Sequence, residues 1–437
     1  MTEKRERPHT SPRLFEVPTA WTSLHSLPPF SALITRLAVL CSLLCIPQLR
    51  AADYFWLAAP LTANWSTSGG DKNWNGHASD KWNDGNTAIF NVSSSIMNVN
   101  LVQAISAQGL TFSQAGYQIH LGTHTLTVGT AGIIANASAT LSGGNLTLGG
   151  NQSWSVAASE TLAVSSIIGA SANLTKTGTG TLVMSGNNTY SGTTTVNAGT
   201  LQVGSGGVGR TGTGAVTVNI NSTILGTGTI QGSSFTLNSG ATLRAGDSAS
   251  TSSHGTLTFT PATLNNVNLQ GNVILDVSTP TNSGSVDPTF GGNTVGSLGY
   301  IAYVSNASRA TGTGTGSHDL LVFNNPLLAT TNFLTSGGAM QVLGSSSFNP
   351  AMGQIYNLLD WSSLVTMNFL GFNVGTNYRT GAAGNEGQLD LPTLTGGLLW
   401  DVSQFTSQGI IVVVPEPSRV ILMIFGLLAF ALRRRRY

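Results

Sequence analysis

Residues 173–204, NLTKTGTGTLVMSGNNTYSGTTTVNAGTLQVG, decide the fold of this chain. They contain very short apolar segments separated by Thr-Gly, Gly-Asn-Asn and Asn-Ala-Gly turn sequences, and they show no apolar period of 3.6 residues. A unit of this kind has too few apolar residues to bury a core by itself. The stretch therefore indicates one coil of a structure that repeats.

A comparable apolar residue recurs along the chain at steps of 16 to 20 residues. The series comprises Leu126, Leu146, Leu162, Leu182, Leu201, Val218, Leu237 and Leu257. A period near twenty indicates a solenoid, in which stacked coils bury the apolar residues together. We predict an all-β fold, a parallel β-helix, with roughly eight coils between residues 105 and 260 and a length of about 40 Å. Almost no helix is expected outside the two terminal segments.

The same stretch resembles the autotransporter-associated β-strand repeat, whose form is roughly K-x-G-x-G-x-L-x-L-S-G-x-N-T-Y-S-G-x-T-x-V-x-x-G-T-L-x-V. The residues that fill this pattern are Lys176, Gly178, Gly180, Leu182, Ser185, Gly186, Asn188, Thr189, Tyr190, Ser191, Gly192, Thr194, Val196, Gly199, Thr200, Leu201 and Val203. The resemblance covers one full repeat, with less regular coils on both sides. It implies a right-handed parallel β-helix in an exported surface protein, and it implies no chemistry.

The charge of the chain is concentrated at its two ends. Six of the 18 Lys and Arg precede Ala52 and five lie from Arg419 onward, which leaves seven for residues 53–413 against 13 Asp and Glu. The body therefore has a net charge near −6, and a nucleic-acid partner is not expected because phosphate binding needs basic clusters. Only 8% of the residues are charged, while 41% are hydrophobic, which is enough to bury a core.

Residues 1–52 have the pattern of a long secretory signal peptide read by the Sec export machinery. A basic segment precedes the apolar run 37–46, and a small-residue cleavage site follows at Ala51 and Ala52. The apolar run is too short to span a bilayer, which disfavours the alternative of an N-terminal membrane anchor. Both cysteines, Cys41 and Cys45, lie in this run. We therefore expect a mature protein without disulfides or Cys-bound metal.

Residues 53–100 are rich in tryptophan and are predicted to form an N-terminal cap. A solenoid must cover the apolar core and the unpaired strand edge of its first coil. The alternative is an exposed aromatic platform for sugar rings beside Asp71, Asp80 and Asp84. The candidate glycan contacts in that case are Trp65, Trp74 and Trp82.

Two patterns in the repeat region look like functional motifs but do not fit the local structure. Gly204, Gly206 and Gly209 spell G-x-G-x-x-G, yet another β segment follows where a dinucleotide fold needs a helix. His120 and His124 are four residues apart, but they flank a turn between strands rather than one helix face. We predict no catalytic, cofactor-binding or metal-binding residues here.

Residues 261–413 are predicted to form distal β coils and an irregular C-terminal cap. The period fades, while β-like segments become longer at 272–277, 319–323 and 339–343. The sequences G-x-V-x-L-D-V at 271–277 and H-D-L-L-V at 318–322 resemble the distal coils that follow such repeats. Trp361 and Trp400 are expected in the cap.

Residues 414–437 resemble a PEP-CTERM sorting signal. Pro415, Glu416 and Pro417 match the recognition tripeptide, residues 420–432 are apolar, and Arg433, Arg434, Arg435 and Arg436 follow. Thirteen apolar residues form about 20 Å of helix, short of a hydrocarbon core of about 30 Å, and an Arg cluster stays on the cytoplasmic side. The resemblance implies a short transmembrane helix in the precursor, cleavage by an exosortase-type enzyme, and transfer to the surface or matrix of a Gram-negative-type bacterium. A permanent tail anchor is the alternative.

Two function classes follow from these features. The first is a non-enzymatic surface or matrix protein, structural or adhesive, with an extracellular polysaccharide among its expected contacts. The second is a carbohydrate-active enzyme or glycan-binding protein, since polysaccharide lyases and hydrolases also use parallel β-helices. In residues 101–260 the only carboxylates are Glu160 and Asp247, which do not provide the usual catalytic pair. This sparseness favours the non-enzymatic class.

Overall fold

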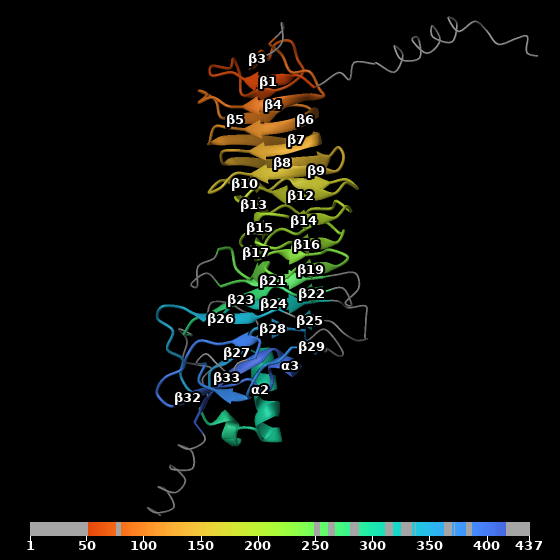
Figure 1. Cartoon of the computed structure of the whole chain (residues 1–437). Helices are drawn as coiled ribbons and strands as arrows, with labels where there is room; N and C mark the ends of the chain where they lie inside the picture. The colour runs from red at the N-terminus through yellow and green to blue at the C-terminus, as the bar shows by residue number, and fades with distance from the viewer. Residues whose placement is uncertain are drawn as a thin grey trace, which may run out of the picture. The chain divides into compact units, whose positions relative to one another are not determined.

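The computed structural model describes residues 51–75, 80–248, 254–260, 267–279, 288–310, 318–324, 334–336, 338–361, 369–370, 372–381 and 387–416. The chain divides into two compact units, Met1–Arg50 and Ala51–Tyr437. The first unit, which holds most of the predicted signal peptide, lies outside the described residues. The second unit is a parallel β-solenoid, and Figure 1 shows its strands following one another along the stack in chain order.

One row of parallel strands, called face 1 here, runs along the stack from the N-terminal cap to the distal coils. Its strands pair only with the strands of the coils before and after, in consistent register. They are β2 (Asn64–Trp65), β5 (Asn98–Leu101), the first part of β7 (Tyr117–Ala135) and of β8 (Ala139–Leu148), β10 (Thr161–Val164), β13 (Thr181–Met184), β15 (Gly199–Val203), β17 (Ser222–Gly226), β20 (Thr242–Arg244), β23 (Asn272–Val277), β26 (Met340–Gly344) and β31 (Leu389–Asp390).

A second row, called face 2, follows the other side of the same coils. Its strands are β1 (Asp53–Trp56), β4 (Asn86–Phe90), β6 (Ile105–Phe112), the end of β7, β9 (Gln152–Val156), β12 (Leu174–Thr177), β14 (Thr194–Val196), β16 (Val216–Val218), β19 (Phe235–Leu237), β22 (Val267–Leu269), β25 (Leu334–Ser336) and β29 (Phe369–Leu370). Between residues 105 and 260 this row holds about seven coils rather than the predicted eight. The stack also continues on both sides of that stretch.

Shorter strands complete the coils. β11 (Ile167–Gly169) pairs with the end of β8. A parallel sheet joins β18 (Thr229–Ile230), β21 (Thr256–Phe259), β24 (Leu320–Phe323) and β28 (Leu359–Asp360). β3 (Trp74–Asn75) runs antiparallel to β1 at the N-terminal end.

Each strand alternates between core and surface, so the core consists of columns of stacked side chains. On face 1, Leu162, Leu182 and Leu201 occupy equivalent positions in successive coils, and Ile224 and Leu243 continue the column. All five are fully buried. Coils approach so closely that a Cβ at Gly192 would overlap the backbone of Ala172 in the coil before it.

The register of the apolar residues differs partly from the predicted series. Leu126 pairs with Leu146 and Val218 with Leu237, but the next coil after Leu201 supplies Ile224, not Val218. Val218 instead follows Val196 in the face 2 column. Leu162, Leu182 and Leu201 thus lie on face 1 and Val218 and Leu237 on face 2, while Leu126, Leu146 and Leu257 lie in the shorter rows that complete the coils. The step of 17 residues from Leu201 to Val218 is close to the length of a coil, so one periodic series mixes several columns.

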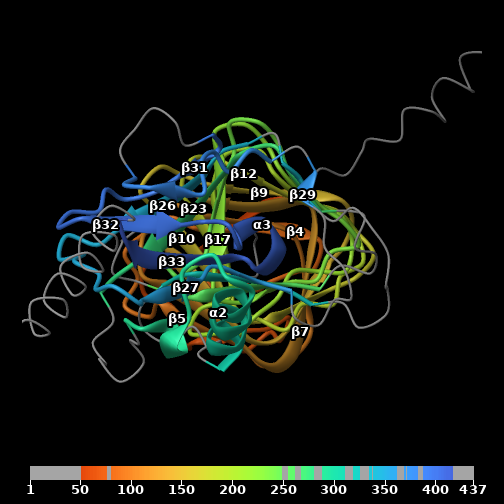
Figure 2. The ribbon, with the colours of Figure 1, turned by 90° about the horizontal axis from the view of Figure 1, so that it is seen from below.

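The C-terminal end is covered by a small antiparallel sheet of β27 (Ile355–Asn357), β33 (Ile410–Pro415), β32 (Leu398–Asp401) and β30 (Tyr378–Arg379). β33 is apolar on both sides. Ile411 and Val413 join the solenoid core, while Ile410, Val412 and Val414 pack against a second apolar cluster. Figure 2, seen along the stack, shows β27 and β33 across its end.

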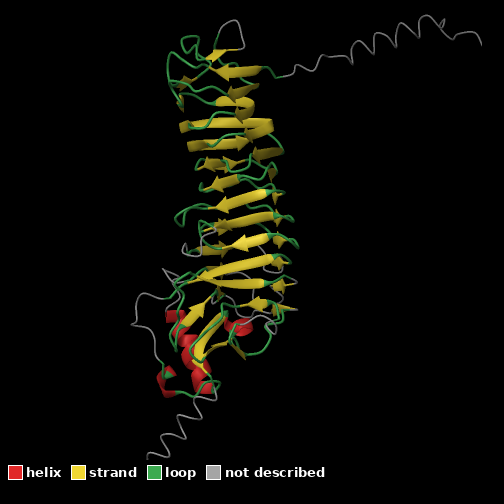
Figure 3. Ribbon diagram, turned by 60° about the vertical axis from the view of Figure 1, so that its left-hand side comes forward, coloured by secondary structure: helices red, strands yellow, loops and turns green. Residues whose placement is uncertain are grey.

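Helices occur at this C-terminal end, where the sequence predicted almost none. Among the described residues they are η3 (Phe290–Gly292), α2 (Leu298–Ala310) and α3 (Phe405–Gln408), and Figure 3 shows them beside the last strands. α2 contributes Tyr300 and Val304 to the cluster that covers β33. The body is mostly β, as predicted, but these helices were not expected; α2 is present because the outer side of the terminal sheet needs an apolar cover.

Candidate functional site

The tryptophans of the N-terminal cap form a closed cluster rather than a surface platform. Trp65, Trp74 and Trp82 are each 0% exposed. Their rings lie 4.9–5.1 Å apart between centroids, and Trp56 lies 5.1 Å from Trp74. A sugar ring stacks only on an exposed aromatic face, so the glycan-contact interpretation of these three side chains does not hold. The packing is that of a cap over the first coil.

The carboxylates beside these tryptophans hold the loops of the cap. Asp71 accepts hydrogen bonds from Ser66 Oγ at 2.5 Å and from Thr62 Oγ1 at 2.9 Å. The bond from Ser66 is the main cause that lowers the pKa of Asp71 below its ordinary value. Asp84 accepts from the indole N–H of Trp82 at 2.9 Å. Asp71 and Asp84 are thus engaged within the chain.

The glycine-rich segment 204–209 is a loop, as the sequence predicted. It lies between β15 and β16, and no helix follows it. The N–H of Gly206 donates to Asp247 Oδ2 at 2.8 Å, and Thr227 Oγ1 donates to Asp247 Oδ1 at 2.7 Å. Asp247 therefore fastens this loop to later coils.

His120 and His124 both lie in strand β7, on either side of an irregularity in its pairing at Gly122, rather than across a turn between two separate strands. His120 Nδ1 is 2.8 Å from Ser142 Oγ of the next coil. In the described part of the chain no group of three or more His, Cys, Asp or Glu side chains is arranged to hold a metal ion.

Lys176 of the matched pattern points into the core, between Trp154 and Val196 in the face 2 column. Its side chain is buried, and Nζ donates to the carbonyls of Thr177 and Gly178 at 2.8 Å and of Ala198 at 3.1 Å. Burial lowers the pKa of Lys176 to about 8. The lysine thus ties together the turns of two successive coils.

The structure brings together a charged cluster that sequence reasoning missed. Arg244 at the end of β20 donates from Nη2 to Asp276 Oδ2 in β23 at 2.6 Å. Asp319, just before β24, accepts from the backbone N–H of Asp276 and of Gly255, each at 2.9 Å. Asp276 and Asp319 are fully buried, and Arg244 is nearly so. The cluster therefore joins two successive coils at the start of the distal region.

Two histidines complete this cluster. Burial lowers the pKa of His318 to about 4 and also lowers that of His254, whose charged form Asp276 partly favours. Burial raises the pKa of Asp276 and raises that of Asp319 to about 8. Shifted pKa values of this kind occur at catalytic sites, but also in structural ion-pair networks. Because neither carboxylate has exposed surface, the arrangement fits a structural role.

The sequence contains a signal for the cluster, since carboxylates lie within or next to apolar strand segments. Asp276 interrupts an apolar run in residues 272–277, and Asp319 precedes another. A carboxylate inside a buried strand requires a partner, because an unpaired buried charge is costly. The partner, Arg244, is 32 residues away in sequence. Only the stacking of the coils identifies it.

The cluster predicts a decline in stability above neutral pH. Between pH 4 and 8 the folded state keeps a proton on Asp319 that the unfolded chain has released, so stability falls as pH rises. Between pH 4 and 6.5 the unfolded chain binds a proton on His318 that the folded state lacks, so this effect raises stability with pH. The two oppose each other up to pH 6.5, and the decline is uncompensated from there to pH 8.

Thermal unfolding followed by circular dichroism between pH 5 and 8.5 tests this prediction. Asp319→Asn should remove the decline in stability between pH 6.5 and 8. The variant should also be less stable than the wild type at low pH, because Asn has one hydrogen-bond acceptor oxygen where Asp319 uses two. Asp390→Asn, an exposed control, should keep the wild-type profile. A profile that rises from pH 6.5 to 8 in the wild type would contradict the assignment.

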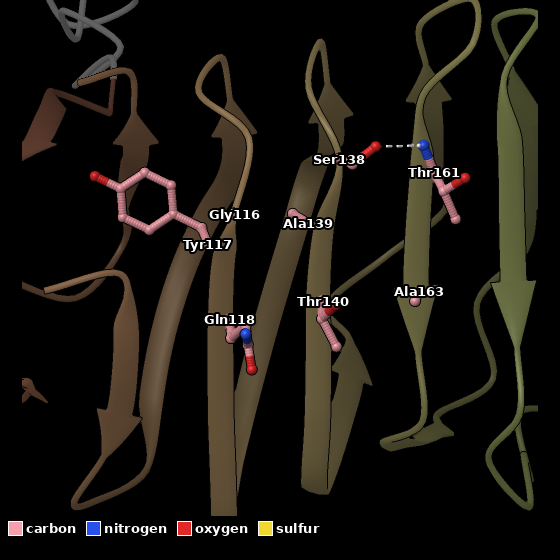
Figure 4. Close-up of a pocket in the computed structure, with 8 residues that line it drawn as sticks. All are labelled: Gly116, Tyr117, Gln118, Ser138, Ala139, Thr140, Thr161 and Ala163. Atoms are coloured by element: carbon pink, nitrogen blue, oxygen red, sulfur yellow. Dashed lines mark hydrogen bonds between the residues drawn. The ribbon is translucent and has the colours of Figure 1, made fainter. Parts of the chain in front are cut away.

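A shallow depression of about 240 Å³ crosses β7, β8 and β10 on face 1 (Figure 4). Its lining is uncharged and comprises Gly116, Tyr117, Gln118, Ser138, Ala139, Thr140, Thr161 and Ala163. Ser138 Oγ accepts from the Thr161 N–H at 3.0 Å and donates to Glu160 Oε2 at 2.6 Å. The lining therefore offers no acid–base pair.

Both predicted processing sites include residues at the two ends of the described part of the chain. At the N-terminal side, the backbone N–H of Ala52, the second residue of the predicted cleavage site, donates to Asn86 Oδ1 at 2.8 Å. At the C-terminal side, Pro415 pairs with Leu398 in the terminal sheet, and the Glu416 N–H donates to the Gly397 carbonyl at 3.1 Å. The folded cap thus extends into the tripeptide.

The rest of the predicted sorting tail lies outside the described residues. This holds for Pro417, the apolar segment 420–432 and the arginines 433–436. Within the part of the chain that is described, no helix is both long and apolar enough to cross a membrane.

Comparison with known proteins identifies the repeat. Residues 174–203 match the family model of the passenger-associated-transport-repeat. This is the stretch on which the resemblance to the autotransporter-associated repeat rests, so that prediction is confirmed for one repeat. No curated protein and no solved structure matches the chain. Such a repeat and a β-solenoid fit a secreted or surface-exposed protein.

Proposed function

We propose that this chain is a non-enzymatic structural or adhesive protein of the cell surface or extracellular matrix. The observation that carries the proposal is the passenger-associated-transport-repeat at residues 174–203, which lies in the middle of a continuous parallel stack. Each coil contacts only its neighbours, and this gives a long body whose repeat region carries few charged residues. Export by the Sec machinery and sorting through the PEP-CTERM-like tail are parts of the same proposal.

A carbohydrate-active enzyme is the second candidate, and the raised pKa of Asp319 is the observation in its favour. A carboxyl group that stays protonated near pH 7 has the property of a general acid. Against this, Asp319 and Asp276 are fully buried and engaged by backbone N–H groups and Arg244. A polysaccharide has no access to them in this fold.

Incubating the purified protein with pectin, alginate and neutral glucans tests the choice between these classes. We expect no release of reducing ends or unsaturated sugars from any polymer. Turnover that is abolished by Asp319→Asn, Glu160→Gln or Asp247→Asn would overturn the non-enzymatic proposal. Loss of turnover together with loss of the folded circular dichroism spectrum would not count, so each variant needs a spectrum.

The sorting part of the proposal predicts a processed C-terminus. The mature protein should lack Arg433 to Arg436 and be recovered outside the inner membrane, because a thirteen-residue apolar segment suits only transient retention. Glu416→Ala should trap the full-length chain, since a carboxylate offers a handle to a basic pocket in the processing enzyme.

Mass spectrometry of the C-terminus after cell fractionation measures this outcome. Glu416→Gln removes only the charge, because it keeps the side-chain shape and the backbone hydrogen bond to Gly397. It should be processed as poorly as Glu416→Ala. An intact Tyr437 on wild-type protein at the cell surface would show a permanent anchor and refute the sorting proposal.

A further inference from the structure

The outer side of face 2 carries two parallel columns of uncharged polar side chains. The first column comprises Ser153, Thr175, Thr195, Thr217, Thr236 and Asn268, which are paired in register from coil to coil. The second lies two residues further along each strand and comprises Ser155, Thr177, Asn197, Asn219, Asn238 and Gln270. The columns begin at β9, since the preceding position of the second column is Ile134.

Four threonine hydroxyl groups of the first column are available for a ligand. Thr175, Thr195, Thr217 and Thr236 are half-buried, and their Oγ1 atoms make no hydrogen bond within the described part of the chain. The β-branched side chain restricts χ1, so each hydroxyl is held in a narrow range of positions. Successive hydroxyls are about 4.8 Å apart along the stack.

The amides of the second column are held in one orientation. Asn219 Nδ2 donates to Asn197 Oδ1 at 2.7 Å, and Asn238 Nδ2 donates to Asn219 Oδ1 at 2.7 Å. Asn219 and Asn238 each have two amide N–H groups, so one N–H of each remains for a ligand. A surface whose polar groups are already fixed loses little conformational entropy on binding.

The shape and chemistry of this strip restrict its partner. It is about 7 Å wide and about 24 Å long, since residues i and i+2 are about 7 Å apart and neighbouring strands about 4.8 Å apart. The resulting area of roughly 170 Å² is far below the 800 Å² or so that each protein buries in a stable complex. The strip also offers no large apolar anchor and no free strand edge for added β-strands, because the coils pair with one another.

We propose that the two columns of face 2 form a binding strip for a linear, uncharged polysaccharide that runs along the stack. A narrow strip that repeats its hydroxyl and amide groups at every coil fits a polymer that repeats its own hydroxyl groups along a line. The absence of charge in both columns gives no preference for an anionic polymer. The inference deepens the proposed function, on which it rests, by naming the surface and the class of ligand.

Each coil contributes a weak contact, so affinity should increase with the length of the glycan. Linked contacts act as a multivalent array, in which the first one raises the effective concentration for the next. Short oligosaccharides should therefore bind weakly, and chains that span several coils should bind much more tightly.

Affinity electrophoresis and sedimentation of the full-length protein with neutral β-glucans of graded length test the proposal. The test variant combines Thr195→Val, Thr217→Val and Thr236→Val, which keeps side-chain shape and removes three hydroxyls. The matched control combines Thr181→Val, Thr200→Val and Thr223→Val, which form the corresponding column on face 1. We expect the face 2 variant to lose at least about tenfold in affinity and the control to change by less than about twofold.

A Thr→Ser version of the face 2 variant keeps the hydroxyls and should retain binding, which separates lost hydrogen bonds from damaged packing. Three outcomes would overturn the proposal: no retention on any β-glucan, equal losses in both Val variants, or tighter, salt-sensitive binding to alginate. Inhibition of ice recrystallisation without glucan binding would assign the strip to ice instead. Surface-localised protein that does not bind glucan refutes this inference alone, whereas glucan-binding protein that stays in the cytoplasm refutes export alone.

Discussion

Replacing Trp74 with alanine is expected to lower the free energy of unfolding by about 3–5 kcal/mol. The indole lies at the centre of the N-terminal cap, with ring centroids 5.1 Å from Trp56, 5.1 Å from Trp65 and 4.9 Å from Trp82. Its removal leaves a cavity that these large rings cannot fill without moving. Because each coil is stabilised only by its neighbours, the loss should spread into the first coils.

Urea unfolding gives the total effect, and hydrogen exchange resolved by peptide gives its location. Amide protection should fall in residues 53–112 and stay near wild type beyond about residue 150. Trp74→Phe is the control, since it keeps most of the ring and removes an indole N–H that has no hydrogen-bond partner among the described residues. A Trp74→Ala protein with unchanged stability would mean that the cap does not depend on this cluster.

Replacing Arg244 with methionine is expected to cost about 3–5 kcal/mol, because it leaves the buried Asp276 carboxylate without its charged partner. The raised pKa of Asp276 shows that burial already disfavours its charge even with Arg244 present. Without Arg244, folding must either bury that charge unpaired or bind a proton. Both alternatives cost free energy near neutral pH.

The double variant Arg244→Met with Asp276→Leu should recover most of the loss, since apolar residues of similar volume often replace a buried ion pair without penalty. Lys72→Met, at an exposed position, should change stability by less than about 0.5 kcal/mol. Chemical unfolding of the wild type and the three variants at pH 6 and pH 8 measures these differences in the free energy of unfolding. A double variant that is as unstable as Arg244→Met alone would show that the pair acts through something other than its charges.

Residues 173–204 alone determined the class of fold. Short apolar segments between glycine turns cannot form a helix or an isolated sheet, so they require stacked coils. The family model of the passenger-associated-transport-repeat matches almost the same residues, 174–203. The sequence also indicated that the tryptophan-rich segment covers one end, because a solenoid needs an end cover. These conclusions depend on local pattern and on burial, which the sequence carries directly.

The tertiary structure decided which residues meet across coils. Leu201 lies above Ile224 rather than Val218, and Arg244 meets Asp276 from 32 residues away, because the length of each connecting loop sets the register. The same stacking aligns Thr195 with Thr217 on the outer surface. A helix, α2, covers the terminal sheet because its strand β33 is apolar on both sides. Sequence period fixes the spacing between neighbouring coils, but loop lengths and the need to cover both ends are settled only when the whole chain packs.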